Sequence, residues 1–445
     1  MRLNTTASNN TAVGYEASYA SSTGASNTAV GWRALTSNTA SNNTAVGFQS
    51  LYDNTTGSYN TAVGQSALEN NTTASNNTAV GYQSLETNTT GASNVAVGYK
   101  TLEANTTANS NTAAGFAAMA ANTTGASNTA FGREALLDNT TGASNVAMGR
   151  ESLANNTTAS YNTALGYQAG LNATTGSVNT FVGGLSAGSG VVTGSHNVGL
   201  GAETLYRLTS GGSNVSIGYQ ALQFNTTGSS NVAIGREALE NNTSGNVNTA
   251  TGHNALLTNT TGFENTASGA NSLKLNTTGY YNSSFGSGSL LSNTTGFENT
   301  AVGFQALVNN TTASNNTAVG YQAGLSNTTG TGNVALGHTA LQSNTTASYN
   351  TVVGYAAAYS NTTGESNTVL GQGAMYVNTT GGDSVAVGRS ALFNNTTGQY
   401  NTALGRSALQ ANTTSTNNTA VGYQAGYANT TGGGNTILGS QTGAN

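Results

Sequence analysis

The sequence predicts an all-β fold, a parallel β-solenoid of about 26 coils that forms one continuous repeat domain over residues 1–445. A glycine that follows a short apolar pair recurs 26 times, from Gly14 to Gly439. The step between these glycines is 17 residues, except for slips near residues 38–41 and 184–200. The chain also has 59 Gly and no Pro or Cys, with much Asn and Thr, which disfavours helices. A fixed period over the whole length predicts stacked repeats rather than separate globular domains.

Each repeat contains one strand-like stretch. We number the unit so that the recurrent glycine is position five, which makes Asn77 to Ser93 one complete unit. Position two is mostly Thr or Val, and β-branched residues favour strands. Position four is apolar almost throughout, with Thr251 and Ser268 as polar exceptions. We therefore expect positions two to six to form a strand and position four to face inward.

The second apolar site of the repeat is position nine, which is mostly Leu. Where it is Gly170, Gly324 or Gly426, the next residue is Leu171, Leu325 or Tyr427, and we expect that side chain to fill the gap. Together, positions four and nine predict a core that includes Val80, Leu85, Val97, Leu102, Leu165, Ile217, Leu222 and Ile234.

The Asn-Thr-Thr-Gly segments, such as Asn88 to Gly91, are typical of turns. Stacked coils would place identical Asn and Thr side chains in hydrogen-bonded ladders. The same segments contain Asn-x-Thr sequons, so glycosylation is an alternative role for them. Small residues at positions three and eight suggest the close approach of another backbone, and we expect lateral association of the coils.

Composition argues against several functions. A net charge of −5 over 445 residues gives no basis for binding nucleic acid, and no apolar run is long enough for membrane insertion. Without Cys there is no thiolate metal site, and three His and few Asp give no catalytic constellation. We expect no catalytic residues, no metal site and no cofactor, so the protein is not expected to be an enzyme.

Position six is rich in aromatic residues that would recur on successive coils. These rings could form a stacking surface for host glycans, or they could simply shield the edge of the core with amphipathic side chains. The candidate glycan-stacking residues are Tyr15, Trp32, Phe48, Tyr82, Tyr99, Phe116, Tyr167 and Tyr219.

The unit Asn299 to Leu307 and the turn Asn88 to Gly91 resemble head repeats of YadA-like trimeric autotransporter adhesins, and also repeat shafts of phage tail fibres. This resemblance covers the whole chain. It implies a left-handed β-roll, association into a homotrimer, binding of host matrix by the outer surface, and inward-facing positions two and four, as at Thr78 and Val80. It also implies an extracellular location, at a cell or virion surface.

Three functions remain open at this stage. The first is a structural fibre that self-associates as a homotrimer or an end-to-end filament. The second is an adhesin or tail-fibre shaft that binds host glycans or matrix. The third is an ice-binding surface made of Thr rows. We also expect the weakest packing near Thr251, Ser268 and Ser287 and in residues 184–194.

Overall fold

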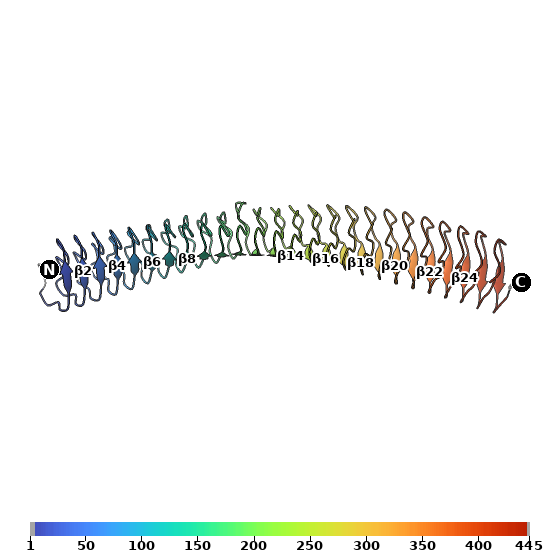
Figure 1. Ribbon diagram of the computed structural model, residues 1–445, viewed down its shortest axis with the longest axis horizontal. Coiled ribbons are helices and arrows are strands. Elements are labelled where there is room, and N and C mark those ends of the chain that lie inside the picture. Colours follow the sequence, from blue (N-terminus) through green and yellow to red (C-terminus); the bar gives the residue numbers. More distant parts are fainter. Residues whose placement is uncertain (1–4, 443–445) are drawn as a thin grey trace. The chain divides into compact units, whose positions relative to one another are not determined.

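A computed structural model describes residues 5–442 of the chain. The chain divides into two compact units, Met1–Thr227 and Gly228–Asn445. Within the described residues, both units consist of three-residue strands joined by turns, without helices. Figure 1 shows one strand in every coil, with the rest of each coil returning as a loop. This is the predicted all-β solenoid.

The strands follow one another at the period of the repeat. Those of the first unit are β1 Thr11–Val13, β2 Thr28–Val30, β3 Thr44–Val46, β4 Thr61–Val63, β5 Thr78–Val80, β6 Val95–Val97, β7 Thr112–Ala114, β8 Thr129–Phe131, β9 Val146–Met148, β10 Thr163–Leu165, β11 Thr180–Val182, β12 Val198–Leu200 and β13 Val215–Ile217. Those of the second unit are β14 Val232–Ile234, β15 Thr249–Thr251, β16 Thr266–Ser268, β17 Ser283–Phe285, β18 Thr300–Val302, β19 Thr317–Val319, β20 Val334–Leu336, β21 Thr351–Val353, β22 Thr368–Leu370, β23 Val385–Val387, β24 Thr402–Leu404, β25 Thr419–Val421 and β26 Thr436–Leu438.

Within each unit, neighbouring strands pair in parallel and in register. Thr78 pairs with Val95 and Ala79 with Ala96 in the first unit, and Thr402 pairs with Thr419 in the second. Because partners occupy the same repeat position, one repeat makes one coil, as the period predicts.

The recurrent glycine is required where neighbouring coils meet most closely. At Gly81 the backbone φ is +138°, and an added Cβ would lie 2.1 Å from the carbonyl oxygen of Gly98 in the next coil. Non-bonded atoms cannot approach each other this closely, and the positive φ itself disfavours residues other than glycine. The glycine therefore sets how closely the coils stack.

Buried asparagine ladders connect the coils. At position twelve, Asn88 Nδ2 donates to Asn71 Oδ1 at 2.9 Å and to the Gly91 carbonyl at 2.9 Å. At position one, Asn77 Nδ2 donates to the same Gly91 carbonyl at 2.9 Å, and Asn77 Oδ1 accepts from the Asn94 backbone N–H at 2.9 Å. The predicted Asn ladders are confirmed, and they satisfy polar groups that the narrow interior would otherwise leave without partners.

Burial of the position-twelve asparagines decides between the turn role and glycosylation of the Asn-Thr-Thr-Gly segments. Asn88 is fully buried, and its amide nitrogen makes one hydrogen bond within its own coil and one to the neighbouring coil. A sugar attached to that nitrogen would break both bonds and has no room in the folded coil. The turn role, rather than glycosylation, therefore accounts for the Asn of the Asn-Thr-Thr-Gly segments.

The core differs from the prediction at position four. Leu85, Leu102 and Leu222 are fully buried, as predicted. Position three, usually Ala, is the inward-facing strand residue, and Ala79 and Ala96 are fully buried. Position four points outward instead. Of the predicted core residues at position four, Val97 (41%), Leu165 (46%) and Ile234 (38%) are exposed. Val80 and Ile217 are only half-buried.

The physical reason is the narrow interior of a seventeen-residue coil. The Leu of position nine fills the space opposite the strand, which leaves room for little more than a methyl group at position three. Since side chains alternate along a strand, an inward Ala79 forces Thr78 and Val80 outward. The small residues at positions three and eight thus line the interior, as at Ala62 and Ala67, and do not mark a contact with another surface.

Positions three and nine share this interior space. Where position nine is Gly170, an added Cβ would lie 2.9 Å from Phe181 Cδ2 and 2.9 Å from Leu153 Cδ2, and Phe181 is fully buried. Gly426 likewise faces Ile437, whose Cδ1 lies 2.8 Å from the Cβ position. The larger residue at position three therefore fills the gap at Gly170 and Gly426, whereas at Gly324 the nearest atom to the Cβ position is Leu307 Cδ2 of the preceding coil, at 3.0 Å. The prediction that the following residue does so is wrong, because Leu171 and Leu325 are half-buried and Tyr427 is 38% exposed.

Both slips of the period lie in turns and leave strand register intact. Thr28 pairs with Thr44 across the shorter coil, and Thr180 pairs with Val198 across the longer one. In the longer region, buried Ala173, Val192 and Leu208 interrupt the Asn ladder, and Asn156 Oδ1 lacks a hydrogen-bond partner.

The coils around Thr251 and Ser268 keep a filled core. Leu256 and Leu273 in these coils are fully buried. The expectation of weak packing there came from the polar residues at position four. Because position four faces outward, those residues remove nothing from the core.

Candidate functional site

The outer face of the strands carries an uncharged apolar stripe. Position two is Thr, Val or Ser throughout the described strands, and position four is mostly a large apolar residue. No acidic or basic residue occupies either position in β1–β26. The exposed members at position four are Val13, Val63, Val97, Phe131, Met148 and Leu165 in the first unit, and Ile234, Phe285, Val302, Leu336, Leu370, Leu404, Val421 and Leu438 in the second.

The candidate glycan-stacking residues at position six form short ladders. Trp32 lies between Tyr15 and Phe48, with ring centroids 6.3 and 4.6 Å apart, and the rings are nearly parallel. Tyr99 lies in the same way between Tyr82 and Phe116, at 5.3 and 5.0 Å. The structure thus brings these six residues together in two groups of three.

The other two members lie apart from these ladders. The Tyr167 ring contacts the guanidinium of Arg150, 5.7 Å from its centroid, and Tyr219 is 46% exposed. Within the ladders each ring covers part of its neighbour's face, so a sugar could stack fully only on an end ring. This arrangement fits a shielding role for the column at least as well as a glycan surface.

The Thr rows of the turns make their hydrogen bonds within the solenoid. The position-thirteen hydroxyl of Thr72 donates to the Thr89 carbonyl at 3.1 Å, and that of Thr260 donates to the Thr277 carbonyl at 3.1 Å. These hydroxyl protons are therefore not available to order water. The neighbouring position fourteen, as at Thr73 and Thr90, is exposed.

Charged residues form local ion pairs at the surface. Arg133, Arg150 and Arg236, all at position six, pair with the glutamate that follows each of them, at 2.9, 2.7 and 2.6 Å. Hydrogen bonds from Gln168 and Arg150 lower the pKa of Glu151. Partial burial raises the pKa of Glu86, and the neighbouring carboxylates of Glu69 and Glu103 raise it further. Exposed pairs of this kind contribute little to stability.

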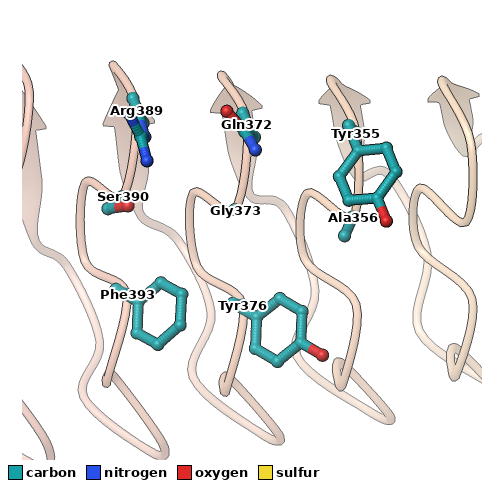
Figure 2. Close-up of a pocket in the computed structure, with 8 residues that line it drawn as sticks. All are labelled: Tyr355, Ala356, Gln372, Gly373, Tyr376, Arg389, Ser390 and Phe393. Carbon is teal, nitrogen blue, oxygen red and sulfur yellow. The ribbon is translucent and has the colours of Figure 1, made fainter.

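A shallow pocket of about 210 Å³ lies beside three consecutive coils of the second unit. Figure 2 shows Tyr355, Gln372 and Arg389 along one side of it and the rings of Tyr376 and Phe393 along the other. The floor between them is made by Ala356, Gly373 and Ser390. The two rings of the wall, Tyr376 and Phe393, are stacked at 5.2 Å, and Tyr359, outside the pocket, continues the stack at 5.1 Å from Tyr376.

Within residues 5–442, no group of three or more His, Asp or Glu could hold a metal ion. The same residues include no helix that is both long and apolar enough to cross a membrane. No protein-family model matches the chain, and a search of curated proteins finds no match.

Sequence reasoning missed both the apolar stripe and the pocket. The stripe was assigned to the core because Val is more often buried than Thr or Ala. The pocket depends on two repeat positions that vary together, with a small residue at position seven and an aromatic one at position ten. Alignment of the repeats by position would have shown this coincidence.

Proposed function

We propose that this protein is a structural fibre subunit, without catalytic activity, whose solenoid units associate side by side with other copies through the outer face of their strands. The observation that supports the proposal is the uncharged apolar stripe at position four, which runs along both units. Water contact with such a stripe is unfavourable, by about 25 cal/mol for each Å² of apolar surface. Extended exposed apolar surface is typical of protein contacts.

The repeat period favours a second copy of this chain as the partner. Strands in register place equivalent side chains about 4.7–4.9 Å apart along each unit. A partner can contact every coil only if its own side chains have the same spacing, and another copy does. A homotrimer would bury the stripe, whereas an end-to-end filament would leave it exposed, and the likeness to YadA-like heads and tail-fibre shafts supports a place at a cell or virion surface.

The same face fits ice less well. An ice-binding face needs side chains of uniform height, whereas position four varies from Ala114 to Phe131 and Met148 on three consecutive strands. Side chains of different size can interdigitate with those of a second protein surface. For this reason we place self-association ahead of ice binding.

The test replaces outward residues of the stripe with lysine. Val97→Lys combined with Leu165→Lys should convert the wild-type oligomer into folded monomers, because a buried, unpaired charge is strongly unfavourable. Thr90→Lys combined with Thr124→Lys, on the exposed turn, is the matched control and should leave the oligomer intact. Molar mass from light scattering and circular dichroism report assembly and folding separately. A wild-type chain that is a folded monomer at every concentration would overturn the proposal.

A further inference from the structure

The pocket of the second unit arises from a coincidence of residues that is confined to three coils. Position seven is small at Ala356, Gly373 and Ser390, and position ten is aromatic at Tyr359, Tyr376 and Phe393. Other coils with a small residue at position seven, such as Ala117 and Gly288, have Ala120 and Leu291 at position ten. The aromatic wall and the open floor therefore occur together at this place.

The missing side chain at Gly373 keeps the pocket open. A Cβ added there would lie 3.6 Å from Phe393 Cε2, so a longer side chain would occupy the space beside the ring. Many other coils have glutamine at this position, and Gln83 and Gln322 adopt the left-handed backbone with φ of 52° that the position requires. The backbone thus accepts a side chain at position seven, and the pocket is a local departure from the repeat.

An unpaired positive charge lies at the rim of the pocket. Three other arginines at position six each pair with a following glutamate. Arg389 and Arg406 on neighbouring coils are instead followed by Ser390 and Ser407, and within residues 5–442 neither forms an ion pair. The Arg406 guanidinium lies over the Tyr423 ring of the following coil, 5.8 Å from its centroid, so Arg389 alone lines the pocket, and a positive charge without a carboxylate partner attracts an anion.

We propose that this pocket binds an anionic saccharide through a single sugar ring that bears a carboxylate. The Phe393 ring, which ends its stack, would pack against the apolar face of the sugar with Tyr376 beside it, as aromatic side chains pack against flat apolar groups. The Arg389 guanidinium would bind the carboxylate with its paired N–H groups. The Gln372 amide and the Tyr355 hydroxyl, on the same side as Arg389, would bind the sugar hydroxyls.

The size and position of the pocket agree with this ligand. A volume of about 210 Å³ accommodates one six-membered ring with its substituents, so the other rings of a bound oligosaccharide would lie outside the pocket. The site uses positions six, seven and ten and none of the outward residues at positions two and four. It is therefore independent of the proposed self-association, and either proposal can fail without the other.

The test is a calorimetric or NMR titration of the full chain with tetragalacturonate, and with maltotetraose as the neutral comparison. Tetragalacturonate should bind at low salt, and maltotetraose at least about tenfold more weakly, because it cannot form the charged hydrogen bonds. Salt at about 0.5 M should weaken the binding of tetragalacturonate. Failure of tetragalacturonate to bind, or equal binding of the two sugars, would overturn the proposal.

Two pairs of variants locate the site. Gly373→Gln should fill the pocket and lower the affinity for tetragalacturonate about tenfold or more, whereas Gly288→Gln, the same change at the same repeat position, should leave it unchanged. Arg389→Gln should have an effect like that of Gly373→Gln, and Arg133→Gln should have none. Equal affinity in Gly373→Gln and wild type would overturn the assignment. Displacement of the sugar by an equal concentration of sulfate would show that the pocket binds any small anion, and it would overturn the proposal of a saccharide ligand.

Discussion

The buried asparagines of position twelve join hydrogen bonds of two kinds in one side chain. Asn88 donates along the coil to Gly91 and across coils to Asn71, and it accepts from Asn105 Nδ2 at 2.8 Å. Loss of one such side chain leaves polar groups of both neighbouring coils without partners. The chain tolerates one such unpaired group at Asn156, whose Oδ1 has no hydrogen-bond partner because Ala173 occupies the next ladder position.

We therefore predict that Asn88→Ala lowers the free energy of unfolding by about 2–4 kcal/mol, because buried Asn71 Oδ1 loses its partner and buried Asn105 Nδ2 loses one of its two acceptors. Urea denaturation followed by circular dichroism measures this. The control is Thr90→Ala on the adjacent exposed turn residue, which should change the value by less than about 0.5 kcal/mol. Equal effects of the two substitutions would show that the ladder contributes no stability.

The carboxyl group of Glu86 gives a prediction for pH dependence. Partial burial raises its pKa in the folded state, and Glu69 and Glu103 add repulsion. A raised carboxyl pKa means that ionisation destabilises the fold at neutral pH, and that this cost disappears as pH falls below the unfolded-state pKa of about 4.3.

Glu86→Gln should accordingly raise the thermal midpoint slightly at pH 7 and leave it nearly unchanged at about pH 4. The amide oxygen can still accept the hydrogen bond that Gln83 Nε2 donates, so the change isolates the charge. Thermal melts of both proteins at the two pH values provide the measurement. A lower midpoint at pH 7 would show that the ionised group stabilises the coil instead.

At the scale of the coil, strand and turn are matched through the shared volume of positions three and nine. The usual pair is Ala with Leu, and the coils around Gly170 use Phe181 with glycine instead. The left-handed backbone at position nine accepts leucine, as Leu153 with φ of 48° shows. One pair of residues should therefore replace the other without loss of stability only if both positions are changed together.

A double-mutant cycle at Gly170 and Phe181 tests this matching. Phe181→Ala should cost about 3–5 kcal/mol through the cavity it leaves, and Gly170→Leu about 1–3 kcal/mol through overpacking against Phe181. The double variant restores the usual pair, so it should be much more stable than the sum of the two costs implies. Additive costs in urea denaturation would contradict a shared space.

The repeat spacing predicts the size of the coil but not the direction of its side chains. Period, strand position and coil size followed from the spacing of glycine and leucine, because each coil must place those residues above their equivalents. The direction of Val80 did not follow, since hydrophobicity alone favours Val over Ala79 as the buried residue. The left-handed backbone conformation of Leu85, with φ of 51°, also did not follow from the sequence. Leucine rarely adopts this conformation, so its residue type does not indicate it.

At the scale of a whole unit, every coil contacts only the coils before and after it. Strand pairing, glycine contacts and Asn ladders all join residues one repeat apart, as at Thr78 and Val95 or Asn71 and Asn88. The natural slips show that a turn can lose or gain one residue while the strands keep their register. Stability should thus depend on whether a change preserves the columns, rather than on how many residues it removes.

Deletion of one whole repeat should therefore be tolerated better than a smaller deletion. Removal of residues 78–94 takes out 17 residues and brings Leu68 below Leu102 and Asn71 below Asn105, so every column continues. Removal of residues 78–85 takes out fewer residues but eliminates Gly81 and Leu85 and leaves a coil too short to close. Circular dichroism melts should give a midpoint close to wild type for the first variant and a lower one for the second. A larger loss of stability from the whole-repeat deletion would contradict nearest-neighbour stacking as the source of stability.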